Sequence, residues 1–279
     1  MITYSDQVYT GERAMFQAKD LLLVRSVFED GESPLKHCQN IKLDSCEFRW
    51  KYPLWYSRNI HAQNCIFTET ARAGIWYSHC IRLEHTVIHA PKTFRRCSEV
   101  IMTDITLPNA AETMWHCNDV RLEHVRITGD YFGMNCSSVI ANDLLIDGNY
   151  CFDGAKNVTV QNARLNTKDA FWNCENVTIS DSVITGEYFG WNSRNVTLIN
   201  CTVESLQGFC FIENLVMKNC RLPNTTLAFE FSSVDAEIIG RIDSVKNPLS
   251  GRIKADSIAE LILDPKQIDP NIIEVISGE

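Results

Sequence analysis

The chain has 279 residues, of which 45% are hydrophobic, and a formal net charge of −9 at neutral pH. This is enough apolar material for an elongated domain with a continuous core, whereas the acidic balance argues against nucleic acid, because phosphate binding requires a clustered basic face. No stretch has the length and apolarity of a transmembrane span, and the first residues lack the basic start and apolar segment of a secretion signal. We therefore expect no nucleic acid, no membrane contact and a cytoplasmic location.

The first segment, residues 1–19, comes before the first full repeat, and we expect it to form an N-terminal cap. The open end of a stacked β structure exposes unpaired strand edges, which proteins usually cover. Val8, Ala14, Met15 and Phe16 supply the apolar side chains that such a cap would use.

A repeat of about nineteen residues occupies 20–232. The segments 40–48 and 59–67 share one template, which is Asn, aliphatic, any residue, apolar, two further residues, Cys, any residue and Phe. Repeats of this template start at Asp20, Asn40, Asn59, Cys80, Glu99, Asp119, Ser138, Asn157, Asn176, Asn195 and Asn214. Such self-similarity is typical of a solenoid, in which each unit buries its apolar face against its neighbours.

A parallel β-helix fits this repeat better than a leucine-rich repeat does. The first half of a repeat contains two short alternating runs, as at Val177/Ile179 and then Ser182/Ile184, and the second half contains Gly, aromatic residues and Cys. This composition favours strands and tight turns over helix. The predicted fold class is therefore all-β, a right-handed single-stranded parallel β-helix with about 19 residues per coil.

Equivalent residues of a β-helix form columns, because successive coils stack about 4.8 Å apart. The first and third residues after each start, such as Ile41 and Leu43, should point inward. The asparagines at the starts, such as Asn40 and Asn59, should form a ladder of hydrogen-bonded amides at a turn.

Nine of the twelve cysteines fall in two columns, where the other coils mostly have Ser, Ala, Thr or aliphatic residues. One column contains Cys46, Cys65, Cys201 and Cys220, and the other contains Cys38, Cys97, Cys117, Cys136 and Cys174. We interpret them as small buried side chains. Column neighbours are too far apart for a disulfide, and we expect no metal site.

Residues 233–279 complete the chain as two degenerate coils and a C-terminal cap or docking tail. The apolar stretch 272–276 could also pair with the edge of another protomer, so a homo-oligomer is one option.

One column in the second half of the repeat contains five of the six tryptophans. Its aromatic members are Trp55, Trp76, Trp115, Trp172 and Trp191, and the next column contains Tyr56, Tyr77, Arg96, His116 and Asn135. Charged residues also occur in the tryptophan column, so it should not be core. The uncharged column just before it is the better core candidate, with Leu35, Leu54, Ile75, Phe94, Met114, Phe152, Phe171 and Phe209.

This aromatic face predicts a groove for an oligo- or polysaccharide, because rings stack on sugars while Arg and Asn bond their hydroxyls. The candidate binding residues are Trp55, Tyr56, Trp76, Tyr77, Arg72, Lys92, Arg96, Trp115, His116, Asn135, Trp172 and Trp191. The alternative is a non-catalytic scaffold in which a loop, a terminal segment or a second protomer covers the tryptophans.

Cleavage would require further residues, and the chain offers candidates without a spacing that singles one set out. A glycoside hydrolase needs two carboxylates, and the candidate pairs are Glu112 with Asp130 and Asp153 with Asp169. We favour the region of Asp130 and Asp153. A polysaccharide lyase would use Arg95 or Lys92 as base and could bind Ca²⁺; otherwise we expect no cofactor. Each of these acids also has an alternative as a solvated turn residue.

The second halves of the repeats carry a family resemblance. The segments 31–36, 50–56, 71–77, 109–113, 148–157 and 168–174 resemble the DUF3737 family of bacterial proteins of unknown function, which is assigned to the pectin-lyase-like β-helices. The resemblance covers almost the whole chain. It implies the fold, but it transfers no activity or catalytic residue, since a fold does not confer a function.

Overall fold

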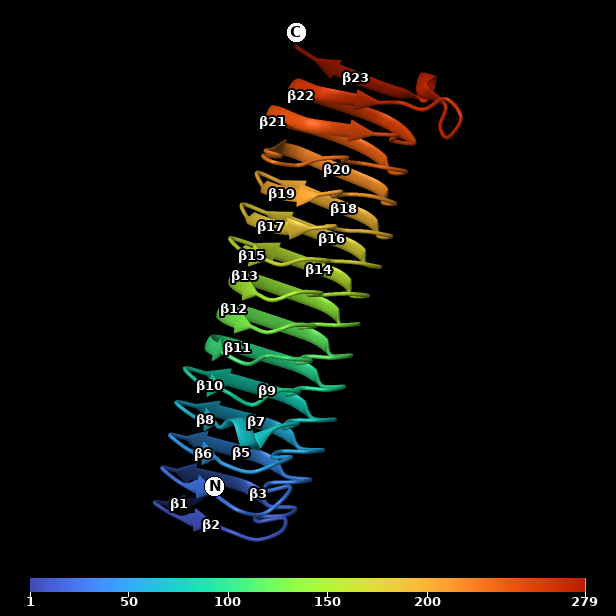
Figure 1. Cartoon of the computed structure of the whole chain (residues 1–279). Coiled ribbons are helices and arrows are strands. Elements are labelled where there is room, and N and C mark those ends of the chain that lie inside the picture. Colours follow the sequence, from blue (N-terminus) through green and yellow to red (C-terminus); the bar gives the residue numbers. More distant parts are fainter. Residues whose placement is uncertain (279) are drawn as a thin grey trace. The chain divides into compact units, whose positions relative to one another are not determined.

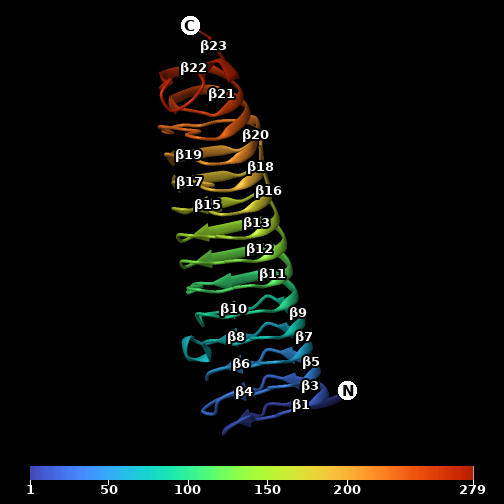
Figure 2. The ribbon, with the colours of Figure 1, turned by 90° about the vertical axis from the view of Figure 1, so that its right-hand side faces the viewer.

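The computed structural model describes residues 1–278 and confirms the parallel β-helix. Strands about one repeat apart pair in parallel, as Ile41 pairs with Ile60 and Ile60 with Ile81. Figures 1 and 2 show these strands stacked in successive layers, β5 next to β7 and β6 next to β8.

The chain divides into two compact units, Met1–Ala141 (unit 1) and Asn142–Glu279 (unit 2). These limits differ from the boundaries at 19/20 and 232/233 that the repeat suggested, which stay predictions.

Most coils of unit 1 have a strand of six residues followed by one of two residues. The elements are β1 (Ile2–Ser5), β2 (Val8–Tyr9), β3 (Lys19–Val24), β4 (Val27–Phe28), β5 (Gln39–Asp44), β6 (Glu47–Phe48), β7 (Arg58–Gln63), β8 (Ile66–Phe67), η1 (Glu69–Ala71), β9 (His79–Glu84), β10 (Val87–Ile88), β11 (Ser98–Leu107) and β12 (Asn118–Thr128). The longer β11 and β12 combine both strands of a coil.

β13 (Ser137–Asp147) includes the boundary, and unit 2 continues with the same architecture. Its elements are β14 (Lys156–Gln161), β15 (Arg164–Asn166), β16 (Glu175–Ser180), β17 (Val183–Glu187), β18 (Arg194–Ile199), β19 (Thr202–Leu206), β20 (Glu213–Cys220), β21 (Ser233–Lys246), β22 (Ser250–Ile262), η2 (Pro270–Ile272) and β23 (Ile273–Ser277). Within 1–278, no helix is long and apolar enough to span a membrane.

The first segment has the strands of a coil, because β1 pairs with β3 and β2 with β4. Val8 is 63% exposed and Phe16 is 40% exposed, so neither side chain plugs the core. At the other end, the expected tail strand is present as β23, which pairs in parallel with β22.

The predicted asparagine ladder is present in both units. In unit 1, Asn59 Nδ2 donates to Asn40 Oδ1 over 2.8 Å, and in unit 2, Asn195 Nδ2 donates to Asn176 Oδ1 over 2.8 Å. These residues have positive φ values between 54° and 58°, a backbone that Asn tolerates well. A second corner of unit 2 carries a further ladder that we did not predict, in which Asn219 donates to Asn200.

The uncharged column before the tryptophans is core, as predicted, and its backbone is left-handed. Leu54, Ile75 and Phe94 are each 0% exposed and have φ values of 60°, 53° and 60°. This backbone costs a non-glycine residue about 1–2 kcal/mol, and burying such a side chain contributes about 1.5–3 kcal/mol. The column can therefore stay left-handed because its side chains fill the core.

The buried Cys/Ser column follows two residues after the tryptophan column and does more than fill space. Ser57 Oγ donates to the Leu35 carbonyl over 2.7 Å, and Cys97 Sγ donates to the Ile75 carbonyl over 2.8 Å. Each side chain therefore satisfies the carbonyl of a left-handed core residue in the preceding coil. This shared donor function explains why Ser and Cys replace each other at most positions of the column.

All twelve cysteines are free thiols, and all except Cys80 are buried. The predicted burial of both cysteine columns is confirmed. Burial raises the pKa of the Cys38 thiol to about 11, because the thiolate would lose its hydration.

Candidate functional site

The tryptophans of unit 1 stack on one another along their column. The rings of Trp55 and Trp76 are 5.1 Å apart and nearly parallel, with 8° between their planes. Their indole Nε1 groups donate to the backbone carbonyls of Ala73 and Lys92 over 2.6 and 2.8 Å. The ring faces that these two tryptophans turn toward each other, and their Nε1 groups, therefore already have partners within the protein. Mainly the edges of the rings remain toward solvent.

Arg95 continues this stack between two tryptophans. Its guanidinium carbon lies 4.8 Å from the ring centre of Trp76 and 4.5 Å from that of Trp115. Glu112 accepts from Arg95 Nη2 over 3.0 Å and pairs with Lys92 Nζ at 3.1 Å. The two candidate bases and one candidate acid therefore form an ion-pair cluster, and their catalytic roles stay predictions.

The next column of unit 1 is also stacked. Tyr56 and Tyr77 lie 4.9 Å apart at 6°, His37 stacks on Tyr56, and the Arg96 guanidinium lies 6.0 Å from the Tyr77 ring. The remaining binding candidates of this unit, His116, Asn135 and Arg72, are exposed.

The tryptophans of unit 2 repeat the pattern. Trp172 and Trp191 are 5.6 Å apart at 12°, and their Nε1 groups donate to the carbonyls of Tyr188 and Gln207. The structure thus brings the predicted tryptophans into stacks, and their role in binding stays a prediction.

The candidate acids lie in different surroundings. Glu112 N donates to the Asp130 carbonyl, which places these two residues on adjacent coils of unit 1. Asp153 belongs to unit 2, where its Oδ1 accepts from Asn173 Nδ2 over 2.9 Å. Asp169 is 3% exposed, and burial raises its pKa, opposed by Lys168 and by a hydrogen bond from Tyr150.

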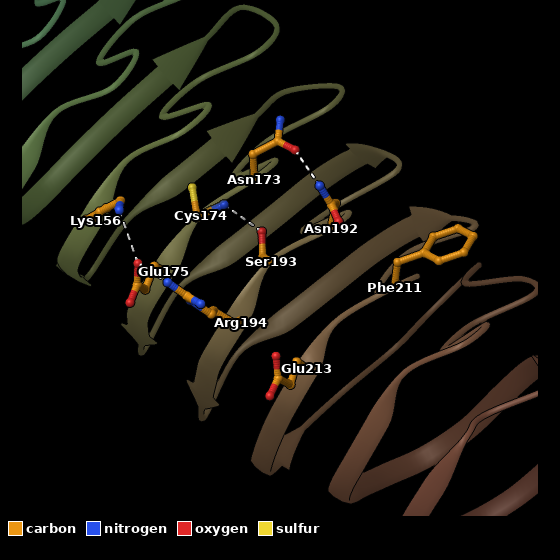
Figure 3. A pocket seen from close by; sticks show the side chains of 9 residues that line it. All are labelled: Lys156, Asn173, Cys174, Glu175, Asn192, Ser193, Arg194, Phe211 and Glu213. Atoms are coloured by element: carbon orange, nitrogen blue, oxygen red, sulfur yellow. Dashed lines mark hydrogen bonds and ion pairs between the residues drawn. The ribbon is translucent and has the colours of Figure 1, made fainter.

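Unit 2 contains a groove that sequence reasoning missed, with a volume of about 350 Å³. One wall is formed by Asn173, Asn192 and Phe211, and the floor contains Cys174 and Ser193. Figure 3 shows the opposite wall, which consists of the charged residues Lys156, Glu175, Arg194 and Glu213. We call this the unit 2 groove.

The two walls are ordered by hydrogen bonds and ion pairs. Asn192 Nδ2 donates to Asn173 Oδ1 over 2.8 Å. Glu175 lies between two cations, 2.7 Å from Arg194 and 3.3 Å from Lys156. These partners lower the pKa of Glu175, the hydrogen bond from Arg194 having the largest effect.

A sequence signal for this groove exists. The residue just before each repeat start alternates in charge from Lys156 to Glu213, and the amides Asn173 and Asn192 directly follow tryptophans. No group of three or more His, Cys, Asp or Glu residues that could bind a metal ion occurs within 1–278.

Two further depressions are smaller than the unit 2 groove. One of about 310 Å³ lies on the outward faces of β5, β7 and β9, where Glu84 pairs with both His61 and Arg82. The other, of about 220 Å³, lies beside β21 and β22. Neither combines an amide ladder with an exposed aromatic ring.

A family model for proteins of unknown function, DUF3737, matches residues 2–276. The chain belongs to the DUF3737 family. No curated protein matches this DUF3737 chain in sequence. The resemblance found in the second halves of the repeats is thereby confirmed.

Solved structures of low identity are also similar to this DUF3737 protein. The pentapeptide-repeat protein HetL of the cyanobacterium Nostoc sp. strain PCC 7120 is 10% identical over 84% of this chain and 89% of its own, with a TM-score of 0.23. The tailspike of E. coli bacteriophage HK620, solved with a hexasaccharide, is 8% identical over 93% and 71%, with a TM-score of 0.42.

Proposed function

We propose that this DUF3737 protein binds a saccharide in the unit 2 groove without cleaving it. The observation that carries the proposal is the lining of the groove, where an amide ladder and a row of charged residues form opposite walls beside Phe211, which is 45% exposed. Saccharide sites combine hydrogen-bonding side chains with an apolar ring surface.

The amides have unused hydrogen-bonding capacity. An Asn side chain offers two N–H donors and two acceptor lone pairs, and the ladder bond between Asn192 and Asn173 uses one of each. Sugar hydroxyls both donate and accept, so they complement the remaining capacity. The stacked tryptophans offer less, because their facing surfaces and Nε1 groups already have partners within the protein.

Binding without cleavage is the better hypothesis for the groove. A glycoside hydrolase needs a general acid whose pKa is raised, whereas the pKa of Glu175 is lowered by Arg194 and Lys156. Glu175 is therefore poorly suited to be the general acid of a glycoside hydrolase.

The proposal is tested by calorimetric titration with neutral and uronic acid oligosaccharides, comparing Asn192→Ala with Asn195→Ala. Both substitutions remove an asparagine that donates in an amide ladder of unit 2, but only Asn192 lines the groove. We expect Asn192→Ala to weaken binding by about tenfold and Asn195→Ala to leave it unchanged.

Equal effects of the two substitutions, or no saturable binding in any series, would contradict the proposal. Incubation of the bound oligosaccharide with the protein, followed by product chromatography, distinguishes binding from cleavage, and we expect the substrate to stay intact.

A further inference from the structure

We infer that the ligand of the unit 2 groove is a linear, neutral saccharide chain that lies along the stacking direction of the coils, with one sugar unit per coil. This inference rests on the proposed function and adds the class of ligand and its orientation.

The orientation follows from the register of the charged wall. In the register of the parallel strands, Lys156 lies next to Glu175, Glu175 next to Arg194, and Arg194 next to Glu213. Four successive coils therefore each contribute one residue to this wall. Parallel strands lie about 4.8 Å apart, which is close to the length of one pyranose unit in an extended chain. A chain running along the groove would therefore meet one charged residue of this wall at each coil.

The opposite wall has the same period over its amide part. Asn173 and Asn192 occupy equivalent positions in successive coils and are joined by a hydrogen bond of 2.8 Å. Asn173 also donates to Asp153, so each amide keeps one N–H donor and at least one acceptor lone pair. Successive sugar units could thus use identical contacts, which a ligand lying across the groove could not.

The neutral character follows from the balance of charges. Two cations, Lys156 and Arg194, alternate with two anions, Glu175 and Glu213, along one wall, and both cations form ion pairs with Glu175. A uronate chain would bring one carboxylate to each coil. These carboxylates would compete with Glu175 for Lys156 and Arg194, and they would also meet Glu213. Like charges placed this close are unfavourable, so the lining discriminates against uronates.

Phe211 distinguishes one end of the groove from the rest. It occupies the position that Asn173 and Asn192 have in earlier coils, and its ring meets Trp191 at 64° with 5.6 Å between centres. Phe231 is its other ring neighbour, at 5.4 Å and 37°. Because neither neighbour lies parallel to Phe211, and Phe211 is 45% exposed, part of its ring surface is available to a sugar ring. The terminal unit of the chain would stack there.

The test is a chain-length series, from disaccharide to hexasaccharide, of cello-, manno-, xylo- and chito-oligosaccharides, with oligogalacturonates as the acidic series. In the neutral series that binds, we expect affinity to rise up to four units, one for each coil, and then to stay constant. Oligogalacturonates of equal length should bind at least about tenfold more weakly.

A plateau at two units, or a preference for galacturonate, would overturn this inference while leaving the proposed function intact. Absence of binding in all series would instead contradict the proposed function itself.

Phe211→Ala sharpens the same test, with Leu206→Ala as the control. The two residues are 45% and 42% exposed, but only Phe211 lines the groove. We expect Phe211→Ala to move the plateau from four units to three and Leu206→Ala to leave it at four. An unchanged plateau in Phe211→Ala would contradict the stacking of the terminal unit.

Discussion

The aromatic stack of unit 1 and the groove of unit 2 use neighbouring columns of the same repeat, yet they offer a ligand different things. In unit 1, Arg95 lies between the rings of Trp76 and Trp115, and Glu112 neutralises the arginine. In unit 2, Asn173 and Asn192 bond each other with part of their capacity only. The comparison indicates that a binding surface of a stacked repeat is identified by unused hydrogen-bonding groups rather than by the presence of aromatic residues.

Breaking the unit 1 stack should have the largest effect on stability. Arg95→Ala removes two ring contacts and the Glu112 hydrogen bond, and we expect a loss of about 3 kcal/mol in the free energy of unfolding, measured with denaturant. Saccharide affinity should not change. A variant of normal stability that has lost affinity would show that the aromatic face is the binding surface instead.

Removing a buried donor should have a somewhat smaller effect. Ser57→Ala leaves the Leu35 carbonyl and the Cys38 N–H without their partner, which should cost about 2 kcal/mol. Ser57→Cys keeps a donor at the same place and should cost less than half as much. Equal losses in the two variants, measured by thermal unfolding, would mean that the column acts through packing alone.

Replacing the buried Asp169 by Asn should give the smallest change in stability, and this change should be an increase. Burial raises the pKa of Asp169 above its ordinary value of 3.8, so the unfolded chain loses this proton first as the pH rises. The free energy of unfolding of the wild type, compared with that of Asp169→Asn, should therefore fall as the pH rises from the pKa of Asp169 in the unfolded chain to its pKa in the folded protein. The wild type should stay less stable than the variant at neutral pH. Denaturation curves at pH 3 and pH 7 would check this, and a neutral-pH loss of stability in the variant would contradict it.

The parts of the fold that repeat could be predicted from the sequence. The inward pairs such as Ile41 and Leu43 and the ladder of Asn40 and Asn59 follow from a period that any alignment of the chain with itself reveals. The core position of Leu54 followed from the absence of charge in its column. Its left-handed backbone did not, because leucine carries no signal for a positive φ.

The groove was harder to predict, because its walls belong to columns on both sides of the Cys/Ser column. Tryptophans such as Trp172 suggested a binding surface through their residue type, but their stacking depends on ring orientation, which a sequence does not give. The acids posed the same difficulty, since Glu112 is neutralised by Arg95 and Lys92 from other positions of the repeat. Only spatial neighbours decide whether a carboxylate is available for chemistry.

Cys80 also gives the protein a practical use in spectroscopy. Among twelve free thiols it alone is partly accessible, at a ladder position of unit 1 where its Sγ contacts Glu99. A maleimide dye should therefore attach at one position without removal of any other cysteine. Partial burial and Glu99 raise the pKa of this thiol, so labelling should proceed faster in mildly alkaline buffer.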